Sequence, residues 1–206
     1  MKNTAGTGLA LCAVLLASNA LADQGVMAGY MPGDIVARAR VVDMNFDSSS
    51  SPAPGVTAND KAIPEVDVSY FFTSHIAAEL ILTYPQSVGI DVNGGNIGSV
   101  DALPPTLTLQ YHFMPDSPYF RPYLGAGINY TNFSNDKLAG GAVTVSNSSW
   151  GAALQAGFDV PLSQNLLFNL DVKKIYMKTD ASMNGAYLTT VTLDPVLLGV
   201  GLGWKF

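Results

Sequence analysis

The chain ends with "PVLLGVGLGWKF" (Pro195–Phe206), a segment in which two kinds of side chain alternate. Large apolar residues occupy every second position from Val196 onward, and the last two of them are Trp204 and Phe206. Glycine fills three of the five positions between them. Because successive side chains of a β-strand point to opposite faces, this segment predicts a strand with one apolar face and one face formed mostly by glycine. Either a protein core or lipid must cover the apolar face.

The composition of the whole chain favours lipid. Hydrophobic residues make up 48% of the chain and charged residues 13%, whereas about 25% of residues are charged in typical soluble domains. After residue 22, no uncharged apolar run reaches the ~18–20 residues that a spanning helix needs. These features together predict a transmembrane β-barrel. The formal net charge of −6 argues against a nucleic-acid partner.

The N-terminus has the features of a secretory signal peptide. A short basic start precedes the apolar run Gly8–Ala17, and Ala20-Leu21-Ala22 matches the small-x-small cleavage pattern. The run is too short to cross about 30 Å of hydrocarbon, which disfavours a membrane anchor. We therefore predict that residues 1–22 are removed and that residues 23–206 form a single outer-membrane barrel domain. Cys12, the one cysteine, lies in the leader, so the mature chain would contain no disulfide.

Eight segments of the chain alternate with a period of two residues and are predicted to be strands. They lie near Asp34–Phe46, Ile63–Phe72, Ile76–Tyr84, Leu103–Phe113, Arg121–Phe133, Trp150–Asp159, Leu166–Val172 and Val196–Phe206. The alternation becomes unclear at Lys174–Lys178, where we expect the membrane rim or a β-bulge.

The connections between these segments alternate in length. Short ones lie around residues 73–75, 114–120 and 161–165, and the others are longer and rich in Ser, Gly, Asn and Asp, as in residues 47–61 and 91–102. This pattern is typical of bacterial outer-membrane barrels. We predict an all-β fold, an eight-stranded antiparallel transmembrane β-barrel with short periplasmic turns, long extracellular loops and both termini in the periplasm. A soluble barrel of the lipocalin kind is disfavoured, because the faces opposite the apolar ones are poor in lysine and rich in glycine and alanine.

If the apolar faces meet lipid, the charged residues on the opposite faces enter the lumen. Four are basic and five are acidic: Arg38, Arg40, Arg121 and Lys173, with Glu65, Asp67, Glu79, Asp159 and Asp171. An unpaired charge in so narrow a barrel is costly, so we predict a paired polar network. This network either only stabilises the barrel or forms a polar gate beneath an outer hydrophobic cavity.

Three prolines fall on two neighbouring predicted strands. Pro85 ends the third strand, and Pro104 and Pro105 begin the fourth. Proline cannot donate a hydrogen bond to the ladder, so these residues predict a lateral opening through which an apolar solute could pass into the membrane. In the alternative interpretation, they lie above the membrane where the strands splay apart.

Six segments of the chain carry a family resemblance: "DIVARARVVDM", "SYFFTSHIAAEL", "LPPTLTLQYHF", "RPYLGAGINYTNF", "WGAALQAGFDVPL" and the ending "LDPVLLGVGLGWKF". They resemble the OmpW family of small outer-membrane barrels. The resemblance covers nearly all of the mature chain and implies an eight-stranded barrel that passes small hydrophobic compounds across the outer membrane. The ending, with Trp204 and Phe206, also resembles the signal that the outer-membrane assembly machinery recognises.

We therefore expect a passive conduit for small hydrophobic solutes, with exit into the membrane. The alternative function is a structural or interaction barrel whose loops contact lipopolysaccharide, phage or host surfaces. The sequence contains no catalytic arrangement of side chains and no metal-ligand spacing, so we expect neither enzyme activity nor a cofactor. The expected partners are outer-membrane lipid and lipopolysaccharide, the assembly machinery and the solutes.

Overall fold

The computed structural model describes residues 28–45, 49–51, 56–58, 61–92, 95–134, 138, 143–183 and 186–206. The predicted signal peptide, residues 1–22, lies outside the described residues. Strands dominate the described part of the chain, and no helix in it is long and apolar enough to cross a membrane.

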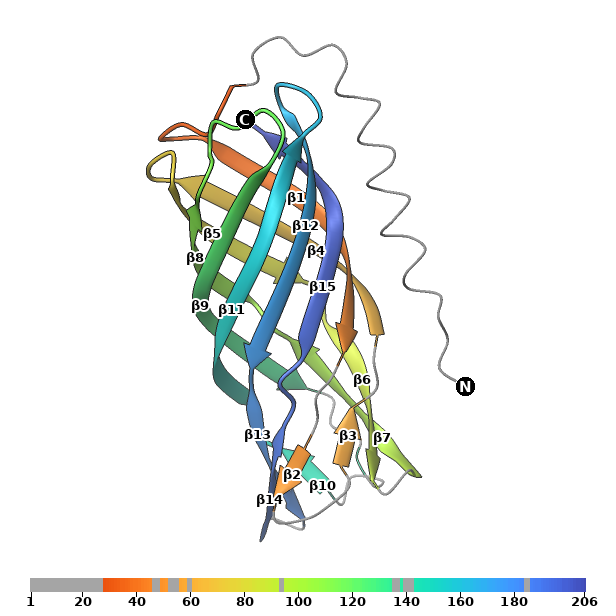
Figure 1. The fold of residues 1–206 in the computed structure, drawn as a ribbon. Coiled ribbons are helices and arrows are strands. Elements are labelled where there is room, and N and C mark those ends of the chain that lie inside the picture. The colour runs from red at the N-terminus through yellow and green to blue at the C-terminus, as the bar shows by residue number, and fades with distance from the viewer. Residues whose placement is uncertain are drawn as a thin grey trace.

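Eight strands form a closed antiparallel barrel, which confirms the predicted fold class (Figure 1). They are β1 (Ile35–Asn45), β4 (Lys61–Phe71), β5 (Ile76–Thr83), β8 (Thr106–His112), β9 (Arg121–Ser134), β11 (Ser148–Pro161), β12 (Leu166–Tyr176) and β15 (Val196–Lys205). Each strand pairs with the next in this order. The pairing of β15 with β1 closes the barrel, so the wall leaves no unpaired edge of the kind that hydrocarbon does not tolerate.

Side chains alternate between the inside and the outside of the barrel along every strand. On β15, Leu198, Leu202 and Trp204 point outward and are about half exposed, as expected of a lipid-facing surface. The glycines between them face inward, where large side chains of β1 occupy the space. A Cβ atom on Gly203 would lie 2.9 Å from Cγ of Arg38. The alternation of the C-terminal segment therefore leaves room for the arginines inside the barrel.

The short connections lie together at one end of the barrel, which we call the short-turn end (Figure 1). Local hydrogen bonds close two of these turns. The backbone N–H of Ile76 donates to Oγ1 of Thr73 at 2.9 Å, and that of Leu166 donates to Oγ of Ser163 at 3.0 Å. Strand β1 begins and β15 ends at this same end, where the N–H of Phe206 donates to the carbonyl of Ile35 at 2.8 Å.

The long connections, predicted as loops, contain seven strands in their described parts. These are β2 (Ser49–Ser51), β3 (Val56–Ala58), β6 (Gln86–Val92), β7 (Gly95–Leu103), β10 (Val143–Val145), β13 (Lys178–Met183) and β14 (Ala186–Thr192). Strands β7, β6 and β3 continue the barrel sheet, and β10, β13, β14 and β2 form a second sheet. Both extend from the end opposite the short turns, the long-loop end (Figure 1). Three of them contain only three residues, too few for a period of two to be recognised, whereas β6 does alternate, with Val88, Ile90 and Val92 separated by small or polar residues.

The unclear register at Lys174–Lys178 is also settled by the structure. Strand β12 ends at Tyr176 and β13 begins at Lys178, and the side chains of Ile175 and Met177 are buried while that of Tyr176 is exposed. The alternation continues through this region.

Candidate functional site

The lumen contains three tiers of inward-facing side chains, and the first closes the short-turn end. The hydrophobic residues of this mouth tier are Tyr30, Val36, Phe71, Ala77 and Leu167. The ring of Tyr30, which precedes β1, is 1% exposed and stacks on Phe71 with centroids 4.2 Å apart. Its hydroxyl donates to Oδ2 of Asp159 at 2.6 Å. Burial raises the pKa of Tyr30 well above its usual value, so the hydroxyl keeps the proton that it donates.

Backbone carbonyls next to Tyr30 hold this segment in place. The carbonyl of Gly29 accepts a hydrogen bond from Nζ of Lys205 at 3.0 Å, and the N–H of Tyr30 donates to the carbonyl of Pro115 at 3.3 Å. Gly29 packs so closely on Asp116 that any Cβ atom would collide with it. The segment before β1 is therefore fitted into the mouth of the barrel.

Arg121, which we predicted in the ionic network, belongs instead to this mouth tier. It is buried, and its guanidinium donates to the carbonyls of Ser117 at 2.8 Å and Ala28 at 3.0 Å. The guanidinium carbon lies 4.8 Å from the centroid of the Tyr30 ring, within the range of a cation–π interaction. Asp159 pairs with Arg121 across the ladder, but its carboxylate is already occupied by other donors, among them Tyr30 and Arg38.

The other eight predicted charged residues form the middle tier, which we call the ionic network. Its members are Arg38, Arg40, Lys173, Glu65, Asp67, Glu79, Asp159 and Asp171. All are 3% exposed or less, so each charge depends on its partners rather than on water.

Arg38 and Arg40 bridge acidic residues from three other strands. Arg38 contacts Asp67 at 3.1 Å through Nη1 and Asp159 at 2.9 Å through Nη2. Nη2 of Arg40 lies 2.6 Å from Asp67 and 3.0 Å from Oε1 of Glu79. The two arginines thus join β1 to β4, β5 and β11 across the lumen.

Lys173 on β12 completes the network by joining it to Glu65 on β4. Its Nζ lies 2.9 Å from Oε1 of Glu65 and 2.7 Å from Oδ1 of Asp171. Nε of Arg40 lies 2.9 Å from the same Glu65 oxygen. The ion pairs are therefore continuous from one wall to the other.

Neutral polar residues, which we did not predict as site residues, fill the gaps of this network. Nε2 of Gln155 donates to Glu79 and to Asp171, both at 2.8 Å. The hydroxyl of Tyr123 also donates to Asp171, at 2.9 Å. Both residues alternate with lipid-facing neighbours along their strands, so the sequence pattern places them on the inward face although they carry no charge. Among the described residues, no group of three or more His, Cys, Asp or Glu side chains is arranged to hold a metal ion.

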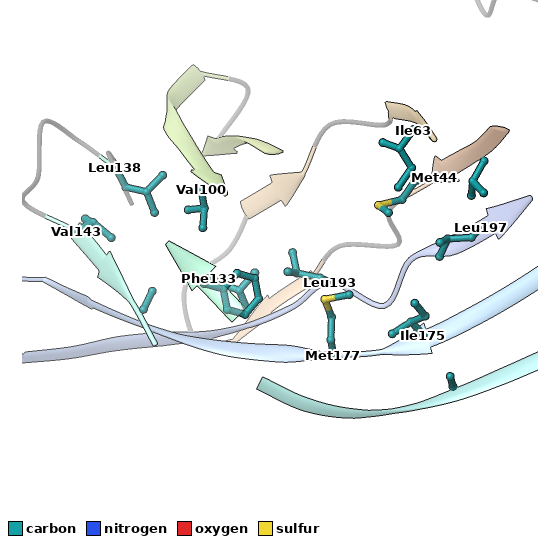
Figure 2. Packing of buried hydrophobic residues seen from close by; sticks show 14 residues of the cluster. Met44, Ile63, Val100, Phe133, Leu138, Val143, Ile175, Met177, Leu193 and Leu197 are labelled. Atoms are coloured by element: carbon teal, nitrogen blue, oxygen red, sulfur yellow. The ribbon is translucent and has the colours of Figure 1, made fainter. Parts of the chain in front are cut away.

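The third tier, toward the long-loop end, is apolar. We call it the apolar tier; its members are Val42, Met44, Ile63, Val100, Phe133, Leu138, Val143, Ala153, Ile175, Met177, Ala181, Val191, Leu193 and Leu197. Figure 2 shows Phe133, Leu193 and Met177 close together within this cluster.

The change from ionic to apolar side chains occurs at the same level on several strands. The next inward residue after Arg40 on β1 is Val42, and Lys173 on β12 is followed by Ile175. On β4, which is antiparallel to β1, the next inward residue from Glu65 toward the long-loop end is Ile63. With the long-loop end taken as the top of the barrel, the reverse of the view in Figure 1, the ionic network therefore forms a floor beneath the apolar tier.

The wall of the barrel is interrupted at this boundary between β5 and β8. Their ladder ends at the pair Ile81 and Thr106. The segment after β5 and the segment before β8 pair again only at Gln86 and Ala102, in β6 and β7. The predicted prolines, Pro85, Pro104 and Pro105, lie between the two ladders. We call the unpaired rungs formed by residues 82–83 and 104–105 the wall break. Thr83 pairs with Glu65 on its other side, which places the break at the level of the network's upper edge.

Comparison with known proteins agrees with this architecture. The model of the OmpW family matches residues 26–206. The chain belongs to the OmpW family. The outer membrane protein OprG from Pseudomonas aeruginosa, whose crystal structure is known, is 31% identical in sequence to this chain. The two structures match with a TM-score of 0.77 over 86% of this chain and 98% of OprG.

Two curated relatives extend the comparison. An uncharacterized outer-membrane protein, y4mB of Sinorhizobium fredii, is 42% identical over 90% of this chain and 84% of its own length. The dibenzothiophene metabolism operon protein PahQ of Pseudomonas aeruginosa is 27% identical over 82% of this chain and 87% of its own length. This OmpW-family chain is therefore an outer-membrane barrel.

Proposed function

We propose that this protein passes small apolar solutes from the long-loop end through the apolar tier and releases them sideways at the wall break. One observation carries the proposal: the ladder between β5 and β8 is interrupted at the level where the lumen changes from apolar to ionic. A solute that descends through the apolar tier reaches the floor at the height of the break. It can then enter the membrane without crossing the ionic network.

The lower two tiers oppose passage along the barrel axis. Moving an apolar solute through the ionic network would separate charges that are paired at 2.6–3.1 Å and buried from water. Below the network, Tyr30 and its neighbours occupy the mouth. Axial flow of solutes or ions is therefore expected to be low.

The apolar tier is packed, so solutes must displace side chains to enter it. Met44 and Met177 belong to this cluster, and their unbranched thioether side chains rearrange readily. This adaptable lining favours solutes of varied shape over a single ligand.

The relative PahQ supports an apolar cargo by analogy. Its name connects it with the metabolism of dibenzothiophene, which is an apolar aromatic compound. Such analogy is associational, since family members share a fold more reliably than a substrate.

Replacing the two prolines of the wall break tests the route. In the double variant P104T/P105V, both positions regain a backbone N–H and can extend the β8 ladder. We expect slower uptake of apolar solutes into asymmetric vesicles with lipopolysaccharide outside and phospholipid inside. Pro64, which pairs with Val41 within the regular ladder of β1 and β4, supplies the control variant Pro64→Val. Uptake by P104T/P105V at the rate of this control would contradict lateral release.

A second candidate function is an interaction barrel, favoured by apolar side chains at the long-loop end. Tyr187 and Leu188 on β14 are 62% and 38% exposed, in the second sheet that extends from the barrel. Replacing both with serine should weaken binding of lipopolysaccharide or cells, without changing solute uptake, if this candidate is correct.

We further propose that the short-turn end faces the periplasm and that the assembly machinery binds the end of β15. Trp204 and Phe206 are 49% and 71% exposed on the outer surface, where another protein can reach them before the barrel enters the membrane.

A further inference from the structure

The two edges of the wall break differ in how their hydrogen-bonding groups are satisfied. Continuing the β5 and β8 ladder beyond Ile81 and Thr106 would place Thr83 opposite Pro104. Proline has no N–H, so the ladder cannot continue normally there.

On the β8 side of the break, the carbonyls of both prolines accept hydrogen bonds from neighbours other than β5. Nδ2 of Asn129 donates to Oγ1 of Thr106 at 2.8 Å and to the carbonyl of Pro105 at 3.3 Å. The N–H of Tyr130 donates to the same carbonyl at 3.1 Å, and Oγ1 of Thr106 donates to the carbonyl of Pro104 at 3.3 Å. The Pro105 carbonyl thus belongs to the ladder with β9, and the Pro104 carbonyl, which faces the β5 side, is satisfied by Thr106 without a donor from β5.

On the β5 edge, one side chain is left without a partner. Oγ1 of Thr83 is buried and makes no hydrogen bond within the described part of the protein. Thr83 follows Ile81 by two residues and Glu79 by four on the same strand. The side chains of Ile81 and Glu79 are 2% and 0% exposed inside the barrel, so Thr83 shares their inward face. A buried hydroxyl without a partner has lost its hydrogen bonds to water without replacement, and a ligand with a hydrogen-bonding group would restore such a bond.

The surroundings of Thr83 disfavour ions. The apolar tier above it cannot solvate a charge, and an ion that enters must lose its hydration. The ionic network below it contains five carboxylates and three cationic side chains, so its formal charge is negative and an anion is repelled further. A suitable ligand is therefore uncharged.

We propose that Thr83 binds the polar group of solutes at the wall break, and that the preferred solutes are small apolar molecules with one uncharged hydrogen-bonding group, such as a phenol or an alcohol. This inference rests on the proposed lateral passage and adds the class of solute. Carboxylates with the same carbon skeleton are excluded.

Three naphthalene probes test this selectivity, because they share one skeleton. Entry of naphthalene, 2-naphthol and 2-naphthoate is followed by fluorescence at neutral pH in the same asymmetric vesicles, and each rate is divided by the rate in protein-free vesicles. We expect the wild type to accelerate 2-naphthol more than naphthalene and to leave 2-naphthoate unaffected.

Two variants of Thr83 isolate its hydroxyl. Thr83→Val removes the hydroxyl at nearly constant volume, and Thr83→Ser retains it. The ratio of 2-naphthol to naphthalene rates should fall about 5-fold in Thr83→Val, as expected for the loss of a net hydrogen bond of ~1 kcal/mol. Thr83→Ser should keep the wild-type ratio. Heat-modifiable migration in gels verifies that both variants are folded barrels.

A binding measurement provides a second readout. NMR titration with 2-naphthol should shift the backbone amide signals of Thr83 and Thr106 in the wild type and much less in Thr83→Val. An unchanged rate ratio in Thr83→Val, or equal acceleration of all three probes by the wild type, would overturn the selectivity alone. A wild type that accelerates none of the probes would overturn the lateral passage, and the selectivity with it.

Discussion

Replacing Arg40 with methionine is expected to cost this barrel much of its stability. The guanidinium of Arg40 lies 2.6–3.0 Å from Asp67, Glu79 and Glu65, and all four side chains are buried. Methionine fills a similar volume but leaves three carboxylates with only Arg38 and Lys173 as cationic neighbours. The variant therefore tests whether paired charges stabilise the middle of the lumen.

The expected loss follows from the burial of these groups. Removing one partner of a buried ion pair typically costs about 3–5 kcal/mol, because the remaining charge has neither water nor a counter-ion. Arg121→Met is the matched control, since Arg121 is equally buried but binds two backbone carbonyls and the Tyr30 ring. Its removal leaves no carboxylate unpaired, and we expect a smaller loss, about 2 kcal/mol.

Urea unfolding in phospholipid vesicles measures both free energies. Trp150 and Trp204, the two tryptophans of the chain, are exposed on the outer surface, so their fluorescence reports departure from lipid. Linear extrapolation to zero urea gives the free energy of unfolding of each variant. Equal losses for the two variants, or a loss below about 1 kcal/mol for Arg40→Met, would refute the conclusion that pairing within the network, rather than arginine burial as such, stabilises the lumen.

Two further changes test the ends of the barrel. Tyr30→Phe removes the donor to Asp159 and should lower the free energy of unfolding by about 1–3 kcal/mol, measured in the same way; a value at wild-type level would mean that the mouth tier contributes by ring packing alone. Deletion of Phe206 removes an exposed ring and one backbone hydrogen bond to Ile35, so it should slow insertion in cells several-fold while the purified barrel keeps near-wild-type stability. Normal amounts of folded Phe206-deleted protein in the outer membrane would refute its role in assembly.

The strands of the barrel and their faces could be predicted from local sequence. In "PVLLGVGLGWKF", alternation alone indicates which residues meet lipid, and the structure agrees for Leu198, Leu202 and Trp204. The inward set of charged residues follows from the same parity, because a strand has only two faces. Most of the short strands in the long connections could not be predicted, since three of them contain only three residues and their formation depends on partner strands elsewhere in the chain.

The levels of residues along the barrel axis, by contrast, depend on the tertiary structure. Nothing in the sequence near Pro104 indicates that the ladder of β5 and β8 ends just before it, or that Thr83 pairs with Glu65 of β4. The sequence also gives no reason for Arg121 to bind carbonyls while Arg38 takes the carboxylate of Asp159. Parity is a property of each strand, but register is a property of strand pairs and is set by the closure of the whole barrel. The coincidence of the wall break with the floor of the apolar tier is therefore visible only in the folded protein.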